Sequence, residues 1–399
     1  MNSLLTDFRY AVRKMAREPL FTLVAVLALA LGIAANTTMF SVVDTVLFQS
    51  LPYGDPEELI FLQEHQPESG VLPVAPANFV DWQRESETFE AFTAYVGPEA
   101  GSRTKFTLIG PGGEPERLQG TSVTANFFQL FEIESVAGRL LTPEDLETSG
   151  DQTVMISHRL WQRRFGGDPN IVGETVVVEG TGRTILGVLP PDFAFPEANV
   201  DLWLPLNFDF SSIRRAHFFQ VVGRLPPDAN LASAQAEMDA LAKNLEQEYP
   251  ATNANLTVEA IPLRDRIVGD TSQTLLLLLA AVGLVLILTC ANVASLMIAR
   301  ATTRQGEMAV RTALGADQQR ITGQLLIEMM VLALVAGGAS LLLTQGLLTL
   351  VGQWAPEGVP RLDQAALDLR VILFTAAVTL LVTFLCGLAP VLSSRRLDL

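Results

Sequence analysis

Cysteine and histidine are scarce in this sequence. The chain has two cysteines and three histidines, namely Cys290, Cys386, His65, His158 and His217. Both cysteines lie in apolar runs, so the long charged region in the first half of the chain has no disulfide available to it. The histidines are isolated and show none of the spacings of a metal site. We therefore expect no metal ligands, and expect each histidine to be exposed or satisfied by a local hydrogen bond.

A phosphate-binding loop is also missing. The sequence contains no G-x-x-x-x-G-K-[ST] motif, and the glycine cluster at 110–113 has no lysine behind it. Acidic pairs such as Glu144-Asp145 occur, but a region rich in carboxylates produces such pairs by chance, and we interpret them as part of a solvated face. We therefore expect no catalytic residue and no cofactor, and the chain should not hydrolyse ATP by itself.

Long apolar runs are abundant, although 18% of the residues are charged. Four runs are almost free of charge, and each reaches the roughly 20 residues needed to cross a hydrocarbon core. Inside a bilayer such runs must be helices, because only helices and closed barrels satisfy every backbone polar group there. We expect transmembrane helices at 20–48, 272–299, 321–352 and 371–392.

The first run has a second interpretation as a cleaved signal peptide. Basic residues precede it, and the small residues Gly32-Ile33-Ala34-Ala35 interrupt it. Apolar character resumes through Met39–Phe48, however, and makes the run long enough to span a membrane. We therefore favour a membrane anchor.

Lysine and arginine determine the expected orientation. Outside residues 50–270, ten of the 12 basic residues fall in three short segments, 9–17, 300–320 and 395–396. By the positive-inside rule these segments are cytoplasmic, so both termini should lie inside a bacterial plasma membrane. Residues 50–270 carry 33 acidic and 15 basic residues, which more than accounts for the net charge of −16. Such an acidic region repels nucleic acid, so we expect no nucleic-acid partner.

These observations predict an α+β membrane protein with four transmembrane helices and a large α+β domain between helices 1 and 2. The region between them mixes β-branched segments with helical patterns, and is compatible with two lobes. Strands are expected at 153–157, 175–178 and 184–188, and helices at 78–90, 158–165 and after the capping residue Asn230.

The expected order along the chain follows from the runs and the charges. The first part should be an amphipathic helix on the inner membrane surface, and the domain between the first two spans should lie outside the cytoplasm. The remaining connections are a cytoplasmic turn, a short outer loop and a cytoplasmic tail. The boundaries outside the spans are 1–19, 49–271, 300–320, 353–370 and 393–399.

Two acidic residues and a group of small residues stand out within the apolar runs. Asp44 lies near the outer end of its run and is expected at the membrane interface. Glu328 lies about two turns inside the third run, so it should face other helices. A proton path needs a relay of such groups, and this sequence has only one acidic residue deep within an apolar run. We therefore interpret Glu328 as a contact between helices. A narrow stretch predicts close helix packing within a monomer or across a dimer: Ala333, Ala336, Gly337, Gly338 and Ser340.

The most specific pattern lies where the second run continues into the basic turn, NVASLMIARATTRQGEMAVRTALGA at 292–316. Arg304, Glu307 and Arg311 have the three- and four-residue spacings of helix ion pairs, and Gly315 is placed to end the helix. A plain connector would explain the arginines but not such a strongly structured turn.

This turn resembles that of the FtsX-like, MacB-type ABC transporter permeases, which reads A-R-x-x-x-R-x-x-E-x-A-[VI]-R-x-A-L-G-A. Other segments look like the duplicated subgroup of these permeases: LALGIAANTTMFSVVDTVL, LPYGDPEEL, TANFFQLFEIESVAGRLLTPED, LWQRRFGGDPNIVGETV and GVLPPDFAFP. The resemblance implies a MacB-like periplasmic core domain. It also implies docking of a separate ATP-binding subunit, which alone binds ATP, on Arg300, Arg304, Glu307, Arg311, Leu314 and Gly315.

The resemblance implies that these permeases transmit force. Closure of the ATP-binding partner, driven by ATP, would move the cytoplasmic turns and rearrange the outer domain, and this movement would serve export or efflux. Two alternatives remain open, a regulator of extracytoplasmic cell-wall enzymes and a membrane-anchored sensor or scaffold without an ATPase. Duplicated members carry the four-helix unit twice, whereas this sequence ends after its fourth run. The sequence is compatible with a half-unit, a truncated product or a single-unit member that dimerises, and we expect a homodimer or pairing with a second permease unit. An export role would add a membrane-fusion or outer-membrane partner.

Overall fold

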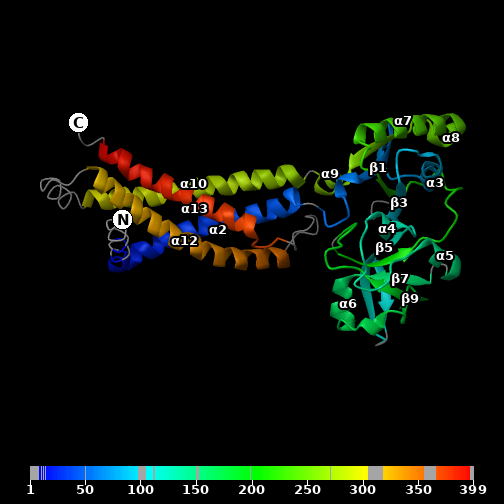
Figure 1. The fold of residues 1–399 in the computed structure, drawn as a ribbon, viewed down its shortest axis with the longest axis horizontal. Helices are drawn as coiled ribbons and strands as arrows, with labels where there is room; N and C mark the ends of the chain where they lie inside the picture. Colours follow the sequence, from blue (N-terminus) through cyan, green and yellow to red (C-terminus); the bar gives the residue numbers. More distant parts are fainter. Residues whose placement is uncertain are drawn as a thin grey trace. The chain divides into compact units, whose positions relative to one another are not determined.

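Helices and strands divide where the sequence changes from apolar to mixed composition. Two units result, a helical bundle within residues 1–49 and 270–399, and an α+β domain at 50–269 (Figure 1). The computed structural model describes residues 9, 11, 13, 15–49, 51–97, 105–110, 113–149, 152–197, 199–269, 271–303, 318–354 and 365–395.

Long apolar helices make up the bundle. They are α2 (Pro19–Val43), which continues as the π-helix η1 (Asp44–Phe48), then α10 (Thr271–Thr303), α12 (Gln318–Trp354) and α13 (Leu369–Arg395). In the described part of the chain, four stretches are long and apolar enough to cross a membrane, namely Pro19–Phe48, Thr271–Ala299, Leu326–Val351 and Leu369–Gly387. Helices α2 and α13 each contact all three of the other helices, and the contacts of α2 with α12 and α10 are the most extensive in the bundle.

The bundle has an apolar core around the N-terminal half of α2. Ala25, Leu29 and Ile33 are fully buried there, and Cys290 of α10 and Cys386 of α13 belong to the same cluster. The opposite face of α2 carries large exposed side chains, as expected for a helix face in contact with lipid: Leu20, Leu23, Val24, Leu27 and Leu31.

The α+β domain contains a single continuous sheet. Its strands are β1 Leu59–Gln66, β2 Gly70–Leu72, β3 Ala91–Val96, β4 Lys105–Ile109, β5 Pro115–Val123, β6 Ala137–Gly138, β7 Thr153–Ile156, β8 Thr175–Val178, β9 Thr181–Val188, β10 Val200–Pro205, β11 Phe219–Arg224 and β12 Thr257–Pro262. Its helices are α3 Pro76–Glu85, α4 Phe127–Leu130, α5 Pro143–Ser149, α6 His158–Phe165, α7 Leu231–Glu248, α8 Pro250–Asn253 and α9 Leu263–Val268, with 3-10 turns η2 Pro56–Glu58 and η4 Pro169–Ile171.

One lobe of the domain is an antiparallel sheet in the order β3-β11-β1-β12. Successive side chains of a strand point to opposite faces, and β1 shows this directly. Ile60 and Leu62 pack with the buried faces of α3 and α7, whereas Leu59 and Phe61 pack into an aromatic core on the other face. Helix α7 is fixed at its start by Asn230, whose side chain accepts from the backbone N–H of Ser233 at 3.0 Å.

The other lobe is a ring of strands. The order β10-β7-β9-β8-β4-β5 closes on itself because β10 also pairs with β5 in parallel. The ring is filled by aliphatic side chains such as Leu108, Val178, Ile185 and Leu202, all of which are fully buried. The predicted two-lobe α+β domain is therefore present, and the strand ring joins the antiparallel sheet where β3 pairs with β5.

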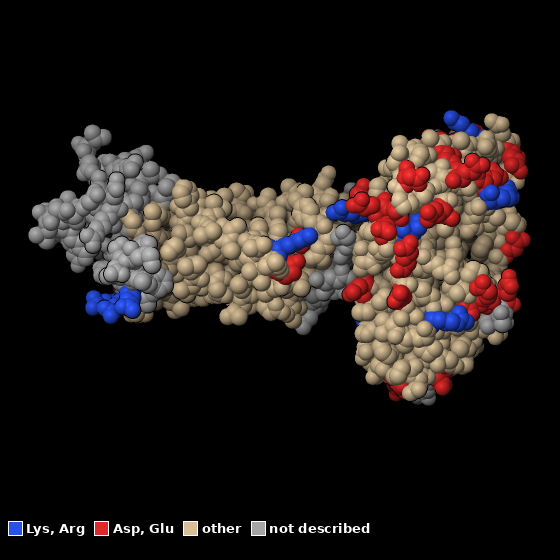
Figure 2. Space-filling view, viewed as in Figure 1, with Lys and Arg blue, Asp and Glu red and all other residues tan. Residues whose placement is uncertain are grey.

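Several local predictions for this domain are confirmed. Helix α6 spans the predicted 158–165, and α7 begins directly after Asn230. The helix predicted at 78–90 ends earlier, at Glu85, because the backbone N–H of Glu87 and the hydroxyl of Ser86 both donate to the Glu237 carboxylate, each at 2.6 Å. Figure 2 shows acidic side chains spread over the α+β domain, as its composition predicts.

Candidate functional site

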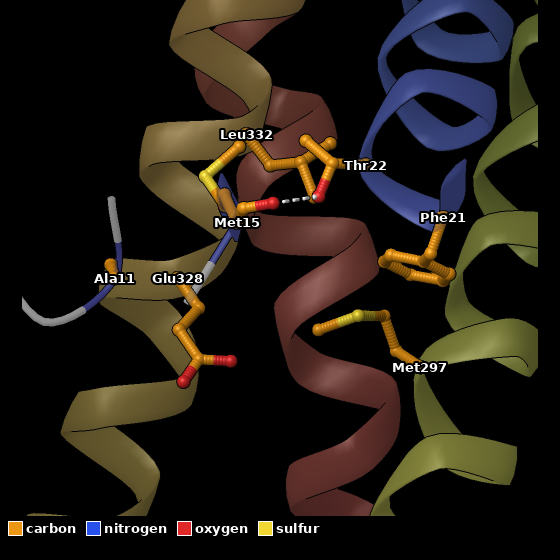
Figure 3. Close-up of a pocket in the computed structure, with 7 residues that line it drawn as sticks. All are labelled: Ala11, Met15, Phe21, Thr22, Met297, Glu328 and Leu332. Carbon is orange, nitrogen blue, oxygen red and sulfur yellow. Dashed lines mark hydrogen bonds between the residues drawn. The ribbon is translucent and has the colours of Figure 1, made fainter. Parts of the chain in front are cut away.

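A small cavity lies among the helices of the bundle (Figure 3). Its volume is about 20 Å³, which is room for about one water molecule. Seven residues line it, from the N-terminal segment, α2, α10 and α12: Ala11, Met15, Phe21, Thr22, Met297, Glu328 and Leu332. A cavity of this size cannot accommodate a transported molecule.

Among the described residues that line the cavity, Glu328 alone carries a carboxylate, and its side chain is buried. It faces other helices, as the sequence predicts, next to Ala11 and Met15 of the N-terminal segment. The Thr22 hydroxyl donates to the Met15 carbonyl at 3.1 Å and so ties this segment to α2. In the described residues of the segment, Arg9 and Arg13 are exposed while Ala11 is buried, so its apolar side packs on the bundle.

The two predicted packing glycines have different surroundings. A Cβ atom on Gly337 would lie 2.7 Å from the Thr379 hydroxyl oxygen, so α12 and α13 approach closely there. A Cβ atom on Gly338 would meet nothing within 4 Å. Of the two, only Gly337 therefore serves close packing inside this chain.

The predicted coupling residues fall at the edge of the described chain. Helix α10 continues beyond the apolar run to Thr303, and the backbone of Arg300 belongs to it. Arg304, Glu307, Arg311, Leu314 and Gly315 lie outside the described residues.

A second buried region of the bundle is polar and was not predicted from the sequence. We call this region the polar layer. It surrounds the C-terminal half of α2, and each of its side chains is buried: Asn36, Thr37, Thr38, Ser41, Ser340, Thr344, Thr375 and Thr379. A sequence signal was present, since hydroxyl residues recur every four positions in both α2 and α13.

Cross-helix hydrogen bonds connect the polar layer. The Asn36 amide donates to the Val282 carbonyl of α10 at 3.1 Å, and the Ser41 hydroxyl donates to the Ala366 carbonyl before α13 at 3.0 Å. The hydroxyls of Thr37 and Thr375 lie 3.1 Å apart. Such bonds between membrane helices contribute about 0.6 kcal/mol each on average. They therefore favour one relative position of the helices only weakly.

Asp44, near the outer end of the first apolar stretch, is buried within the bundle. Its carboxylate is buried at the start of η1, where the Gln49 amide donates to it at 3.2 Å and Arg370 lies 3.7 Å away. The π-helical segment η1 begins at Asp44, four residues before the end of the first apolar stretch at Phe48. The position of Asp44 at the membrane interface stays a prediction.

In the α+β domain, a buried carboxylate organises a polar network. Glu64 is fully buried in β1 and accepts from the Ala75 backbone N–H at 3.1 Å and from the Asn78 amide at 2.6 Å. His217 Nδ1 lies 2.7 Å from the same carboxylate, and this hydrogen bond raises the pKa of His217 above its usual value. Arg214 continues the network through an ion pair with Asp81 at 2.7 Å.

This network is structural in character. His217 is satisfied by Glu64, as the sequence analysis expected of a histidine in this chain, while His65 is exposed and His158 packs edge-on against Trp161. Across the residues that the structure describes, no group of three or more metal-ligating side chains comes together.

Comparison with known proteins decides the family. A family model described as the MacB-like periplasmic core domain matches residues 22–241, which is more than half of the chain, and a model described as the FtsX-like permease C-terminal matches residues 279–399. The chain is a MacB/FtsX-type permease. Membership in this ABC transporter family indicates a multi-pass inner-membrane protein.

Relatives of this permease are about 25% identical to it over the aligned residues. The macrolide export ATP-binding/permease protein MacB of Hahella chejuensis is 25% identical over 281 residues, covering 69% of this chain and 41% of the relative. A probable syringafactin export ATP-binding/permease protein, SyfD of Pseudomonas syringae pv. tomato, is 24% identical over 290 residues, covering 70% and 41%. This chain thus spans about two-fifths of the length of these relatives.

A solved structure shows a weaker likeness. The periplasmic region of MacB from Actinobacillus actinomycetemcomitans matches 56% of this chain and 95% of its own, at 14% identity and a TM-score of 0.38.

Proposed function

We propose that this permease transmits ATP-driven movement from a separate ATP-binding subunit to its extracytoplasmic domain, and that the movement drives export or efflux. Both relatives described above are named as export proteins that combine ATP-binding and permease parts. This chain corresponds to about two-fifths of their length and has no phosphate-binding loop. ATP is therefore bound by the partner alone in this proposal.

One structural observation carries the proposal. The predicted coupling turn joins α10, which ends at Thr303, to α12, which begins at Gln318, and both helices are continuous through their apolar stretches. Both also contact α2 along the bundle. A displacement of the turn by a partner would therefore be transmitted to the helix that leads into the α+β domain.

The assembly in this proposal follows from the same arrangement. Both termini and the coupling turn lie in the cytoplasm, where the basic residues place them. Because ATP-binding subunits of ABC transporters act in pairs, the permease forms a homodimer or pairs with a second permease unit. A membrane-fusion or outer-membrane protein would receive the exported molecule.

Reversal of one charge in the coupling turn tests the proposal. Glu307→Lys would remove the two helix pairs predicted from the sequence, which are worth only about 0.2–0.5 kcal/mol each, so a helix at this position should persist. Loss of a charge contact at a protein interface costs about 2–5 kcal/mol, so copurification of the ATP-binding subunit should fall at least tenfold. The measurement is quantitative mass spectrometry of proteins that copurify with the tagged permease.

The matched control is Glu68→Lys, which makes the same charge change at an exposed position between β1 and β2. It should leave the copurified ATP-binding subunit unchanged, and both variants should reach the membrane in normal amounts. Equal retention of the partner by the two variants would show that the turn is a plain connector.

A further inference from the structure

Helices α2 and α13 each carry hydroxyl residues at intervals of four. Residues four apart lie on one side of a helix, one turn from each other. On both helices these positions face the bundle interior, and all but Thr383 are buried. The first series is Thr37 and Ser41 of α2 with Thr45 of η1, and the second is Thr375, Thr379 and Thr383 of α13.

The two series run antiparallel and are in register at one point. Thr37 and Thr375 are in hydroxyl contact at 3.1 Å, and the rings of Phe40 and Phe374 stack at 3.9 Å. Further along, Asp44 lies 3.7 Å from Arg370, the second residue of α13. Residue numbers rise along α2 as they fall along α13, so a lengthwise displacement of α2 changes which hydroxyls face each other.

The hydroxyls of α13 can accept from whichever α2 hydroxyl faces them. Thr375 donates its hydrogen to the Val371 carbonyl at 2.8 Å, and Thr379 donates to the Thr375 carbonyl at 2.7 Å. A hydroxyl has one hydrogen and two lone pairs, so both α13 oxygens keep an acceptor site. Thr37 is therefore the donor in its contact with Thr375.

Displacement by one turn, about 5.4 Å, has different outcomes in the two directions. Movement of α2 toward its own N-terminus places Ser41 opposite Thr375 and Thr37 opposite Thr379, which replaces one hydroxyl pair with two. Movement the other way places Ile33 opposite Thr375 and Thr37 opposite Val371, which leaves no hydroxyl pair. The pattern therefore favours displacement in one direction only.

We propose that α2 has two positions against α13, the present one and one displaced by a single turn toward the N-terminus of α2, with hydroxyl pairs formed in both. The present position is held by the Phe40–Phe374 stack, the Asp44–Arg370 pair and the Ser41 bond to the Ala366 carbonyl. The displaced position exchanges these contacts for the additional hydroxyl pair. As the step that carries force along the bundle, this device rests on the proposed function.

Disulfide trapping tests the two positions directly. In a Cys290→Ala, Cys386→Ala background, three cysteine pairs are oxidised with copper phenanthroline in native membranes and quantified by peptide mass spectrometry. The pair from Thr37→Cys and Thr375→Cys reports the present position, and Ser41→Cys with Thr375→Cys reports the displaced one. Ile33→Cys with Thr375→Cys is the control for displacement in the opposite direction.

The first two pairs should form disulfides within one chain, and the control pair should form at least tenfold more slowly. Adding Thr379→Val should slow disulfide formation between positions 41 and 375 about threefold, the effect expected from loss of one hydrogen bond between membrane helices. The rate for positions 37 and 375 should be unchanged. Formation of the first pair alone would overturn the proposal, as would equal rates for all three. Because no ATP-binding subunit takes part, these outcomes are independent of the Glu307→Lys result.

Discussion

Among individual residues, His217 makes the α+β domain sensitive to pH. Its hydrogen bond to buried Glu64 raises the pKa of His217 above the unfolded value of 6.5. A raised pKa means that the folded state holds the proton more tightly, so the stabilisation is complete below pH 6.5 and is lost as pH rises through the higher folded pKa. Hydrogen bonds to charged groups contribute about 1.5–3 kcal/mol, which bounds the loss.

The unfolding temperature should fall as the pH increases from 6 to 9. The measurement is thermal unfolding monitored by tryptophan fluorescence. Three of the chain's four tryptophans, Trp82, Trp161 and Trp203, lie in this domain, and the fourth, Trp354, ends α12, so most of the signal reports unfolding of the α+β domain. His217→Gln keeps a hydrogen-bond donor without titrating, and should flatten the profile. A wild-type profile as flat as that of His217→Gln would contradict this role.

Asp145 shows where residue-scale prediction failed. It was interpreted as solvated, yet its side chain is buried, and a hydrogen bond from Arg139 lowers its pKa to about 2. The Thr142 backbone N–H also donates to it at 2.9 Å, in the capping arrangement at the start of α5. The sequence signal for this helix cap was present, because Thr142 is followed three residues later by the acidic residue Asp145. The partner Arg139 lies in an irregular segment, so its approach is set by the fold.

At the scale of elements, the contact between α12 and α13 depends on a missing side chain. Gly337→Ala would place a methyl group 2.7 Å from the Thr379 hydroxyl, which is itself held by the Thr375 carbonyl. Overpacking of this kind costs about 1–3 kcal/mol. Gly338→Ala adds the same methyl group to open space and should be neutral or slightly stabilising.

Thermal unfolding measured with a thiol-reactive fluorogenic dye separates the two variants. Cys290 and Cys386, the chain's two cysteines, are both buried in the bundle, so dye labelling reports bundle opening. Gly337→Ala should unfold several degrees below wild type, and Gly338→Ala should not. Equal unfolding temperatures would mean that the two helices separate easily at this point.

Helices were predicted correctly where apolar residues recur at helical spacing or form a long run. The spacing of Leu231, Met238 and Leu245 identifies α7, and each apolar run became a long helix. Strands β10 and β11 were missed because all of their residues are buried, and a strand buried on both faces shows no alternation. The polar layer was missed because threonine and serine scarcely lower the mean hydropathy of a span, although they decide which helix faces meet.

At the scale of the whole molecule, topology is the most direct prediction. Single cysteines replacing Ser233, at an exposed position in α7, and Thr303, at the end of α10, should differ in their reaction with a membrane-impermeant thiol reagent. In intact spheroplasts the first should be labelled and the second should not, since basic residues flank only the second. Permeabilised membranes provide the control, in which both should react.

Labelling of position 303 but not 233 in intact spheroplasts would reverse the topology and place the coupling turn outside, away from ATP. At this scale the sequence predicted the division into an apolar bundle and an acidic α+β domain. It could not show how the strands close into a ring, because the β5–β10 pairing joins segments about 80 residues apart.

The polar layer also bears on how the protein is made. Thr38, Thr375 and Thr379 each donate to a carbonyl of their own helix, four residues back, at 2.8, 2.8 and 2.7 Å. Such a side chain brings no unsatisfied donor into the hydrocarbon when its helix enters the membrane alone. These three threonines therefore do not hinder the separate insertion of α2 and α13 during synthesis, and the cross-helix bonds of Thr37 and Ser41 can form later, when the helices associate.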